Sequence, residues 1–502
     1  MFKHFFLVSS LLCVVHGKTW NHFNFHRDRL IRLTTENDDF PDMWFPQRLD
    51  HFDHTNVTQW KQRYQKNDQM YKAGGPILLM LGGEGPIGAH WMTNGLWFDV
   101  AQKHNGVMFQ LEHRFYGSSH PTPDCSVKNL RFLSSQQALA DAATFVSWVK
   151  SQYPSSKVFS FGGSYSGALS AWLRLFYPHL IDGSFSASGP YRAKVDFFEY
   201  EETVNYVLDT ASIGCADKLA TAVNIVTSMF QVEKDKLKQE FRLCDDLTSD
   251  GQDLYSLIET LMDPFDEAVQ YGDDNRNFEG EKPPVYKDAK AVCTVFDSAQ
   301  SPVDGLSAVI RHYLNATEQK CLDASYSASV KMLSETGWIA SGVAGGARQW
   351  VWQTCTEFGY YQTVHGTLNM SDPLPLSYFI QQCGDVYGTK YGMENFLDQA
   401  ANNSNIVYGG LDLKSTRTII FNGNYDPWSQ LSVTWPLAPN HETYTFFVPQ
   451  AAHCAVLYPA SETDTLALQS ARSSIMAIFD QWITGSVEPD FAKYARSSPG
   501  HA

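Results

Sequence analysis

The sequence predicts an α/β fold with a large inserted helical domain. Two observations carry this prediction. Apolar runs of strand length, such as 76–81, 107–111, 158–161 and 418–421, end in glycine-rich or polar turns. The chain of 502 residues is also too long for one compact core. We therefore expect a main domain that an insertion divides.

The most informative of these turns follows the run 158–161. The turn Gly162-Gly163-Ser164-Tyr165-Ser166 leads directly into a helical pattern over 169–180. It matches G-x-S-x-G, with serine in place of the last glycine. Such a strand-to-helix turn lifts a serine hydroxyl clear of the sheet, and its neighbours are small because the backbone doubles back. Ser164 is thus the candidate nucleophile, although the motif alone also fits an ordinary glycine-rich turn.

An acid and a histidine follow at the ends of two later strands. Asp426 lies in the turn after 418–421, and His453 follows the strand-like run 443–448. A serine hydroxyl needs an imidazole as general base, and the imidazole needs a carboxylate to fix its tautomer. Alone, each residue fits an ordinary turn or surface position. In the order Ser164, Asp426, His453 they match the triad of the α/β-hydrolase fold.

A glycine-rich loop follows the early run 76–81. In this fold that loop donates one backbone N–H to the oxyanion hole, and the residue after the nucleophile donates another. These donors are assigned to Gly82 and Gly83 in the loop and to Tyr165. A phosphate-binding loop is excluded because the G-x-x-x-x-G-K-[ST] pattern is absent. Glu84 either contacts a substrate's amino terminus or is a buried structural residue.

A charged trio, Glu112-His113-Arg114, follows the run 107–111. We interpret it as a structural ion-pair corner, because His453 already fits the position of the general base.

Longer stretches resemble one family of serine peptidases. They lie at 47–52, 82–85, 112–117, 130–135, 137–141, 162–165, 352–359, 422–428 and 452–454. The chain resembles the family of lysosomal prolyl carboxypeptidase, dipeptidyl peptidase II and thymus-specific serine protease, most of all the thymus-specific branch. The resemblance implies that Ser164, Asp426 and His453 are the charge-relay residues, and that proline precedes the cleaved bond.

More residues lie between Ser164 and Asp426 in the chain than the strands and helices of the fold need there. Segments of helical spacing and four cysteines fall between about 192 and 343. We expect a signal peptide at 1–17, a hydrolase domain in two parts at 18–191 and 344–488, a disulfide-braced helical cap at 192–343, and a tail at 489–502. The run 350–356 is expected to return as a core strand.

The N-terminus predicts the compartment. A short basic start, an apolar run over 5–15 and small residues before position 18 are typical of a cleavable signal peptide. No later run is long enough to span a bilayer. We therefore expect a protein of the secretory pathway, secreted or lysosomal, without an integral membrane segment.

Cysteines and sequons agree with an oxidising compartment. Beyond Cys13, eight cysteines remain, which allow up to four disulfides of unspecified connectivity. Cys454 is expected to anchor the His453 loop through a bridge. No C-x-x-C pair occurs, which argues against a zinc knuckle or a thioredoxin-type site, and we expect neither a metal site nor a cofactor. Glycosylation is predicted at the four sequons, Asn56, Asn315, Asn369 and Asn402.

These features predict a serine exopeptidase that hydrolyses short peptides, because a cap over the cleft admits only chain ends or short chains. Carboxypeptidase and dipeptidyl-peptidase modes both stay open. The alternatives are an esterase or lipase on the same fold and a catalytically silent binding protein. The net charge of −16 argues against nucleic-acid partners. The expected partners are peptide substrates, and the oligomeric state stays open, a homodimer included.

Overall fold

The computed structural model describes residues 39–272, 285–366, 372–436 and 442–485. The predicted signal peptide, the predicted tail and the sequon at Asn369 lie outside these residues. The other three sequon asparagines are accessible: Asn315 and Asn402 are exposed, and Asn56 is half-buried. No helix in the described ranges is long and apolar enough to cross a membrane.

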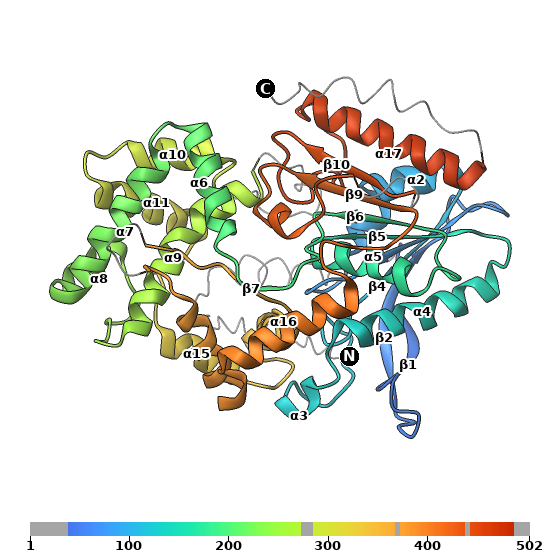
Figure 1. Cartoon of the computed structure of the whole chain (residues 1–502), viewed down its shortest axis with the longest axis horizontal. Coiled ribbons are helices and arrows are strands. Elements are labelled where there is room, and N and C mark those ends of the chain that lie inside the picture. Colours follow the sequence, from blue (N-terminus) through green and yellow to red (C-terminus); the bar gives the residue numbers. More distant parts are fainter. Residues whose placement is uncertain (1–38, 273–284, 367–371, 437–441, 486–502) are drawn as a thin grey trace, which may run out of the picture.

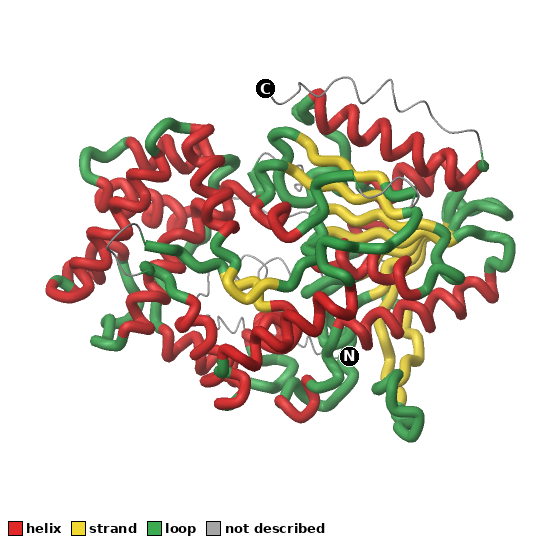
Figure 2. Tube along the Cα trace, in the orientation of Figure 1, coloured by secondary structure: helices red, strands yellow, loops and turns green. Residues whose placement is uncertain are grey.

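An eight-stranded sheet forms the centre of the main domain (Figure 2). Its spatial order is β1-β2-β4-β3-β5-β6-β9-β10. Strand β2 pairs antiparallel with β1 and β4, and all the other pairs are parallel. The strands are β1 (Met43–Arg48), β2 (Gln59–Asn67), β3 (Ile77–Leu81), β4 (Val107–Leu111), β5 (Val158–Gly163), β6 (Gly183–Ala187), β9 (Thr418–Gly423) and β10 (Tyr444–Val448).

The central strands of the sheet are buried on both faces, which explains why strands such as β3 and β4 read as continuous apolar runs, while the edge strands β1 and β10 keep exposed positions. Side chains alternate along a strand, so Leu78 and Met80 of β3 join one core while Ile77 and Leu79 join the other. Helices α2 (Leu96–His104) and α17 (Leu466–Thr484) cover the first face (Figure 1). Helices α4 (Ser135–Gln152) and α5 (Tyr165–Phe176) pack against the second. The chain has the predicted α/β-hydrolase fold.

A helical region lies beside the sheet and occupies the chain between β6 and β9 (Figure 1). It includes a short parallel pair, β7 (Lys194–Asp196) with β8 (Gly359–Tyr361). Its longer helices are α6 (Glu199–Ala211), α7 (Cys215–Val232), α8 (Lys234–Phe241), α9 (Gly251–Gln270), α10 (Ala289–Asp297), α11 (Pro302–Ala316), α12 (Tyr326–Ser334), α14 (Ala347–Gln353), α15 (Leu376–Tyr387) and α16 (Glu394–Tyr408). The domain boundaries given above stay a prediction.

The expected core strand over 350–356 is wrong. This stretch ends helix α14 and enters a π-helix, Thr354–Phe358. Val351, Trp352 and Cys355 are all buried. A short apolar run that is buried on several sides has the same composition in a strand as in a helix, so hydrophobicity cannot separate the two.

Three disulfides join described residues, and all three lie inside the helical region. The pairs are Cys215–Cys293, Cys244–Cys321 and Cys355–Cys383. The expected bridge at Cys454 is wrong, because Cys454 and Cys125 are both free and buried. The His453 loop is held instead by hydrogen bonds, one of which runs from the Cys454 N–H to Ser188 Oγ (2.9 Å).

The trio 112–114 forms two buried ion pairs at the end of β4, as predicted. Arg63 Nη1 lies 3.0 Å from Glu112 Oε1. Arg114 binds both carboxylate oxygens of Asp141, with Nε at 2.6 Å and Nη2 at 2.7 Å. Arg114 and Asp141 are fully buried, and this bidentate geometry ties β4 to helix α4.

Arg114→Met tests how much this corner stabilises the fold. The variant leaves the Asp141 carboxylate buried without its main cation, so we expect a loss of about 3–5 kcal/mol in the free energy of unfolding. Urea denaturation followed by tryptophan fluorescence measures the loss. Lys238→Met, which removes an exposed pair with Asp246, is the control and should leave the midpoint unchanged. An unchanged midpoint in Arg114→Met would contradict the argument.

Candidate active site

Ser164 stands at the sharp turn between β5 and α5. Its backbone has φ 58° and ψ −133°, which is a strained conformation for a residue with a side chain. The turn tolerates this only with small neighbours. A Cβ on Gly162 would lie 2.0 Å from the carbonyl oxygen of Ser166, and one on Gly167 would lie 2.7 Å from that of Ala187. Steric exclusion therefore accounts for the glycines that the motif requires.

Ser166 occupies the position where G-x-S-x-G has its last glycine, and its side chain supports the turn. Its hydroxyl donates to the carbonyl oxygen of Gly163 (2.8 Å) and accepts from the N–H of the same residue (3.1 Å). The departure from the motif thus supplies two short-range hydrogen bonds within the turn that carries Ser164.

His453 and Asp426 form a buried pair next to this turn. Asp426 follows β9, and His453 lies in the loop after β10, so the parallel pairing of the two strands brings both residues to one edge of the sheet. The His453 Nδ1 atom lies 2.8 Å from Asp426 Oδ1. Asp426 Oδ1 also accepts the backbone N–H of Trp428 (3.0 Å). Asp426 is fully buried and His453 is 3% exposed.

The charge balance around His453 favours its protonated form. Burial by itself lowers the pKa of His453, but the Asp426 carboxylate and the adjacent Cys454 sulfur raise that pKa well above its ordinary value. The pair is therefore arranged to stabilise an imidazolium, which is the species that forms when a histidine takes a proton from a serine.

Two cavities meet at Ser164. One, of about 190 Å³, is lined by the 82–87 loop, Ser164, His453 and Cys454. The other, of about 140 Å³, extends toward the helical region and is lined by Ser164, Tyr165 and residues of α9, α14 and β8. The sequence-predicted residues Ser164 and His453 therefore line one cavity, and Glu84 lines both.

The assignment of Gly82 as an oxyanion donor is wrong. Its N–H donates to the Leu111 carbonyl (2.8 Å) as part of the pairing between β3 and β4. Gly83 lies one residue further along, where a Cβ would be 3.6 Å from Ser166 Cβ. The Tyr165 N–H belongs to the first turn of α5, where amides have no acceptor within the helix. Gly83 and Tyr165 stay the predicted donors.

The Tyr165 side chain is held from the opposite side by a buried polar network. Its hydroxyl lies 3.1 Å from His113 Nε2 and accepts from Gln353 Nε2 (3.0 Å). Gln353 also accepts from the Tyr116 hydroxyl and donates to Glu357. Burial lowers the pKa of His113 to about 4, so this ring stays neutral in mildly acidic solution. His113 therefore supports Tyr165 and lies outside the His453–Asp426 pair.

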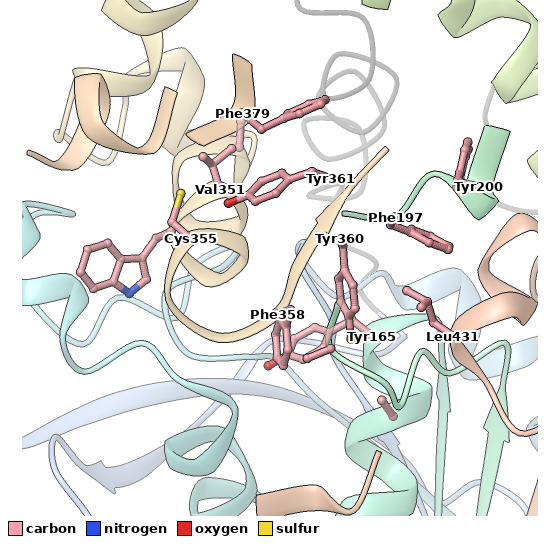
Figure 3. Packing of buried hydrophobic residues seen from close by; sticks show 14 of the residues in the cluster. Tyr165, Phe197, Tyr200, Val351, Cys355, Phe358, Tyr360, Tyr361, Phe379 and Leu431 are labelled. Carbon is pink, nitrogen blue, oxygen red and sulfur yellow. The ribbon is translucent and has the colours of Figure 1, made fainter. Parts of the chain in front are cut away.

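The wall of the cavity of about 140 Å³ is aromatic near Ser164 and acidic along α9. Tyr165, Trp350 and Tyr360 line it, and the ring of Phe358 packs outside this lining, with its centroid 5.5 Å from that of Tyr165 and 5.3 Å from that of Tyr360 (Figure 3). On α9, three acids at a spacing of four residues share one helical face: Glu259, Asp263 and Glu267. The described residues that line this cavity include four carboxylates, Glu84 among them, and no lysine or arginine.

Further carboxyl groups lie behind this acidic face. The buried carboxyl of Glu201 lines a small neighbouring cavity together with Glu259, Asp263 and Asp266. Burial, together with the charge of Asp263, raises the pKa of Glu201 to about 8. Within the described ranges no group of three or more His, Cys, Asp or Glu side chains is arranged to hold a metal ion.

A family model described as serine carboxypeptidase S28 matches residues 47–475, which is most of the chain. The chain belongs to the serine carboxypeptidase S28 family. It is therefore a serine-type peptidase, and the esterase, lipase and silent-scaffold alternatives lose their support. The match runs through the helical region as well as the sheet.

Curated S28 relatives match over most of their own length. The chain is 37% identical over 455 residues to a putative serine protease of Caenorhabditis elegans, covering 88% of this chain and 87% of that protein. It is 32% identical over 461 residues to the thymus-specific serine protease of Mus musculus, with coverage of 88% and 87%. Identity to the lysosomal Pro-X carboxypeptidase of Bos taurus is 28% over 465 residues, with coverage of 88% and 87%.

Sequence reasoning missed the residues that the helical region brings to this S28 site. Gln270, the last residue of α9, accepts the backbone N–H of His453 (2.9 Å) on its carbonyl oxygen. Trp350 and Tyr360 line the cavity from α14 and β8. These contacts join segments that are far apart in the chain, and no local motif marks them.

Gly162→Ala tests the steric account of the turn. The new methyl group would overlap the Ser166 carbonyl oxygen, so we expect the turn to shift and the reactivity of Ser164 toward a fluorophosphonate to fall by at least about 100-fold. Thermal melting measured on the same samples reports the cost in stability. Gly337→Ala is the control, because a Cβ there meets nothing within 4 Å. Equal labelling of both variants would contradict the account.

Proposed function

We propose that this S28 peptidase is a secreted or lysosomal exopeptidase that releases short fragments from the amino ends of peptides, with Ser164, His453 and Asp426 as its triad. The observation that carries the proposal is the buried hydrogen bond between His453 and Asp426, beside a strained serine that lines the same cavity as His453. Three disulfides support a compartment of the secretory pathway.

The chemistry is acyl transfer. Ser164 Oγ attacks the carbonyl carbon of the scissile peptide bond while His453 Nε2 takes the hydroxyl proton. Asp426 holds Nδ1 protonated, so that Nε2 is free to act as the base, and it stabilises the imidazolium that forms. His453 then protonates the leaving amine, and a water molecule hydrolyses the acyl-enzyme by the same steps in reverse.

The N–H groups of Gly83 and Tyr165 receive the oxyanion of the tetrahedral intermediate. One such donor is worth about 3 kcal/mol in the transition state. The network of His113 and Gln353 behind Tyr165 supports this role, because it holds the residue that carries one of the two amides.

The aromatic part of the cavity suits a proline side chain. Tyr165, Trp350 and Tyr360 give a flat apolar wall next to Ser164, and a pyrrolidine ring packs well against such a surface. A relative is named Pro-X carboxypeptidase, and we extend the preference for proline to this chain.

The acidic part of the cavity suits an amino terminus. Glu84, Glu259, Asp263 and Glu267 line the space, and their field favours an ammonium group over a carboxylate. The dipeptidyl-peptidase mode is therefore favoured over the carboxypeptidase mode. The helical region closes the cavity on the side away from the sheet, which limits the length of chain that extends past Ser164.

Labelling and peptide cleavage test the proposal together. The secreted protein should react with a fluorophosphonate probe, and Ser164→Ala should abolish the label. Short peptides with proline at the second position should release amino-terminal dipeptides, while N-acetylated versions should be cleaved at least about 10-fold more slowly because the ammonium group is lost. Mass spectrometry of the products identifies the end that is released.

Two results would contradict parts of the proposal. Release of carboxy-terminal residues with no effect of N-acetylation would reverse the assignment of the cavity. Full labelling of Ser164→Ala would place the reactive group elsewhere.

The pH profile tests the role of His453. The base acts only when neutral, and the pKa of His453 is raised, so kcat/KM should increase with pH from 5 toward 8 with unit slope below that pKa. Asp426→Asn should reduce kcat by about 10⁴-fold and move the acidic limb to lower pH, because the charge that raises the pKa is gone. Asp412→Asn, at an exposed pair with Lys414, should leave the profile unchanged. A flat profile in the parent enzyme would contradict the assignment.

A further inference from the structure

The contacts of Gln270 close a ring of hydrogen bonds around the catalytic pair. The His453 N–H donates to the Gln270 carbonyl oxygen (2.9 Å). Gln270 Oε1 accepts the indole N–H of Trp428 (3.0 Å), and the Trp428 backbone N–H donates to Asp426 Oδ1 (3.0 Å). Asp426 Oδ1 lies 2.8 Å from His453 Nδ1, which completes the circuit.

Three of the four members of this ring belong to the sheet domain, and the fourth comes from the helical region. Asp426 and Trp428 follow β9, and His453 follows β10, whereas Gln270 ends α9. The side chain of Gln270 is itself fixed, because Oε1 also accepts from the Tyr200 hydroxyl of α6 (2.6 Å). Gln270 is 6% exposed, so water does not compete for these bonds.

The end of α9 also contributes charge. The last carbonyls of an α-helix have no partner within the helix and carry the negative end of its dipole. One of these carbonyls, that of Gln270, bonds to the backbone of His453. The rings of Tyr271 and Trp428 flank the imidazole at 6.0 and 6.4 Å. The helix terminus therefore lies against the imidazole that becomes positively charged during the reaction.

We propose that Gln270 is a positioning residue, through which the helical region holds His453 and Asp426 in their catalytic geometry. The inference rests on the proposed roles of His453 and Asp426. A packing role alone predicts a loss of stability when the side chain is changed. A positioning role predicts a loss of turnover per folded active site and a change in the titration of His453.

Gln270→Met keeps the size of the side chain and removes the acceptor. Trp428 then loses the partner of its indole N–H, and the turn that carries Asp426 is free to move. A displacement of about 1 Å at the reacting groups costs about 100-fold in rate. We expect kcat to fall 10- to 100-fold per titrated active site, KM to change less than about 3-fold, and the acidic limb of kcat/KM to move to lower pH.

Two further variants sharpen the test. Gln270→Glu retains an acceptor for Trp428 and Tyr200, so it should rescue most of kcat, while its charge moves the acidic limb to higher pH. Trp428→Phe removes the donor at the other end of the same bond and should resemble Gln270→Met. Because both changes break one interaction, the double variant should be no slower than the slower single variant.

The matched control is Gln252→Met. Gln252 is also a buried glutamine of α9, but its amide donates to Gln381 at the opposite end of the helix. It should leave kcat and the pH profile unchanged. If Gln270→Met equals the parent enzyme in kcat per active site and in pH profile, the inference is overturned, whatever its melting temperature.

A proton NMR measurement keeps this test separate from that of the proposed function. The His453 Nδ1 proton shared with Asp426 should give a downfield resonance, and Gln270→Met should shift or broaden it, while Gln252→Met should not. If the parent protein cleaves no peptide but the resonance still shifts in Gln270→Met, the proposed substrates are contradicted and the positioning role of Gln270 is supported. An unchanged resonance in Gln270→Met would overturn the inference.

Discussion

The short hydrogen bond between His453 and Asp426 is the interaction on which the rest of the site depends. The two residues come from turns after adjacent parallel strands, and the register of β9 with β10 brings those turns together. A buried carboxylate is unfavourable by itself, and Asp426 is fully buried. Its partners, the His453 imidazole and the Trp428 amide, both bind Oδ1 and offset part of that cost, while Oδ2 is buried without a hydrogen bond.

Steric exclusion acts on the nucleophile in a comparable way. The strained backbone of Ser164 is possible because Gly162 and Gly167 stand where no Cβ would fit, and because the Ser166 hydroxyl bonds to both backbone groups of Gly163. Strain of this kind is tolerated where the surrounding structure fixes the backbone from several sides. The turn that exposes the Ser164 hydroxyl therefore requires glycine at positions 162 and 167.

Features that depend on local sequence were predictable, and features that depend on distant pairing were not. The turn at Ser164 and the strands before Asp426 and His453 leave clear local patterns. The donor at Gly82 was assigned wrongly because the use of its N–H is decided by Leu111 on a neighbouring strand. The stretch 350–356 was misassigned because full burial removes the periodicity that separates helix from strand. The contact of Gln270 with His453 could not be predicted, because the sequence around Gln270 does not differ from that around any other buried glutamine in a helix.

The helical region is part of the active site and cannot be regarded as a detachable cover. Its helix α9 presents Glu259, Asp263 and Glu267 to the cavity and ends at Gln270 against His453. A ligand that fills the cavity touches the same helix that binds the His453 backbone. The lining of the cavity and the position of His453 therefore share one structural element, which agrees with a family match whose range includes the helical region.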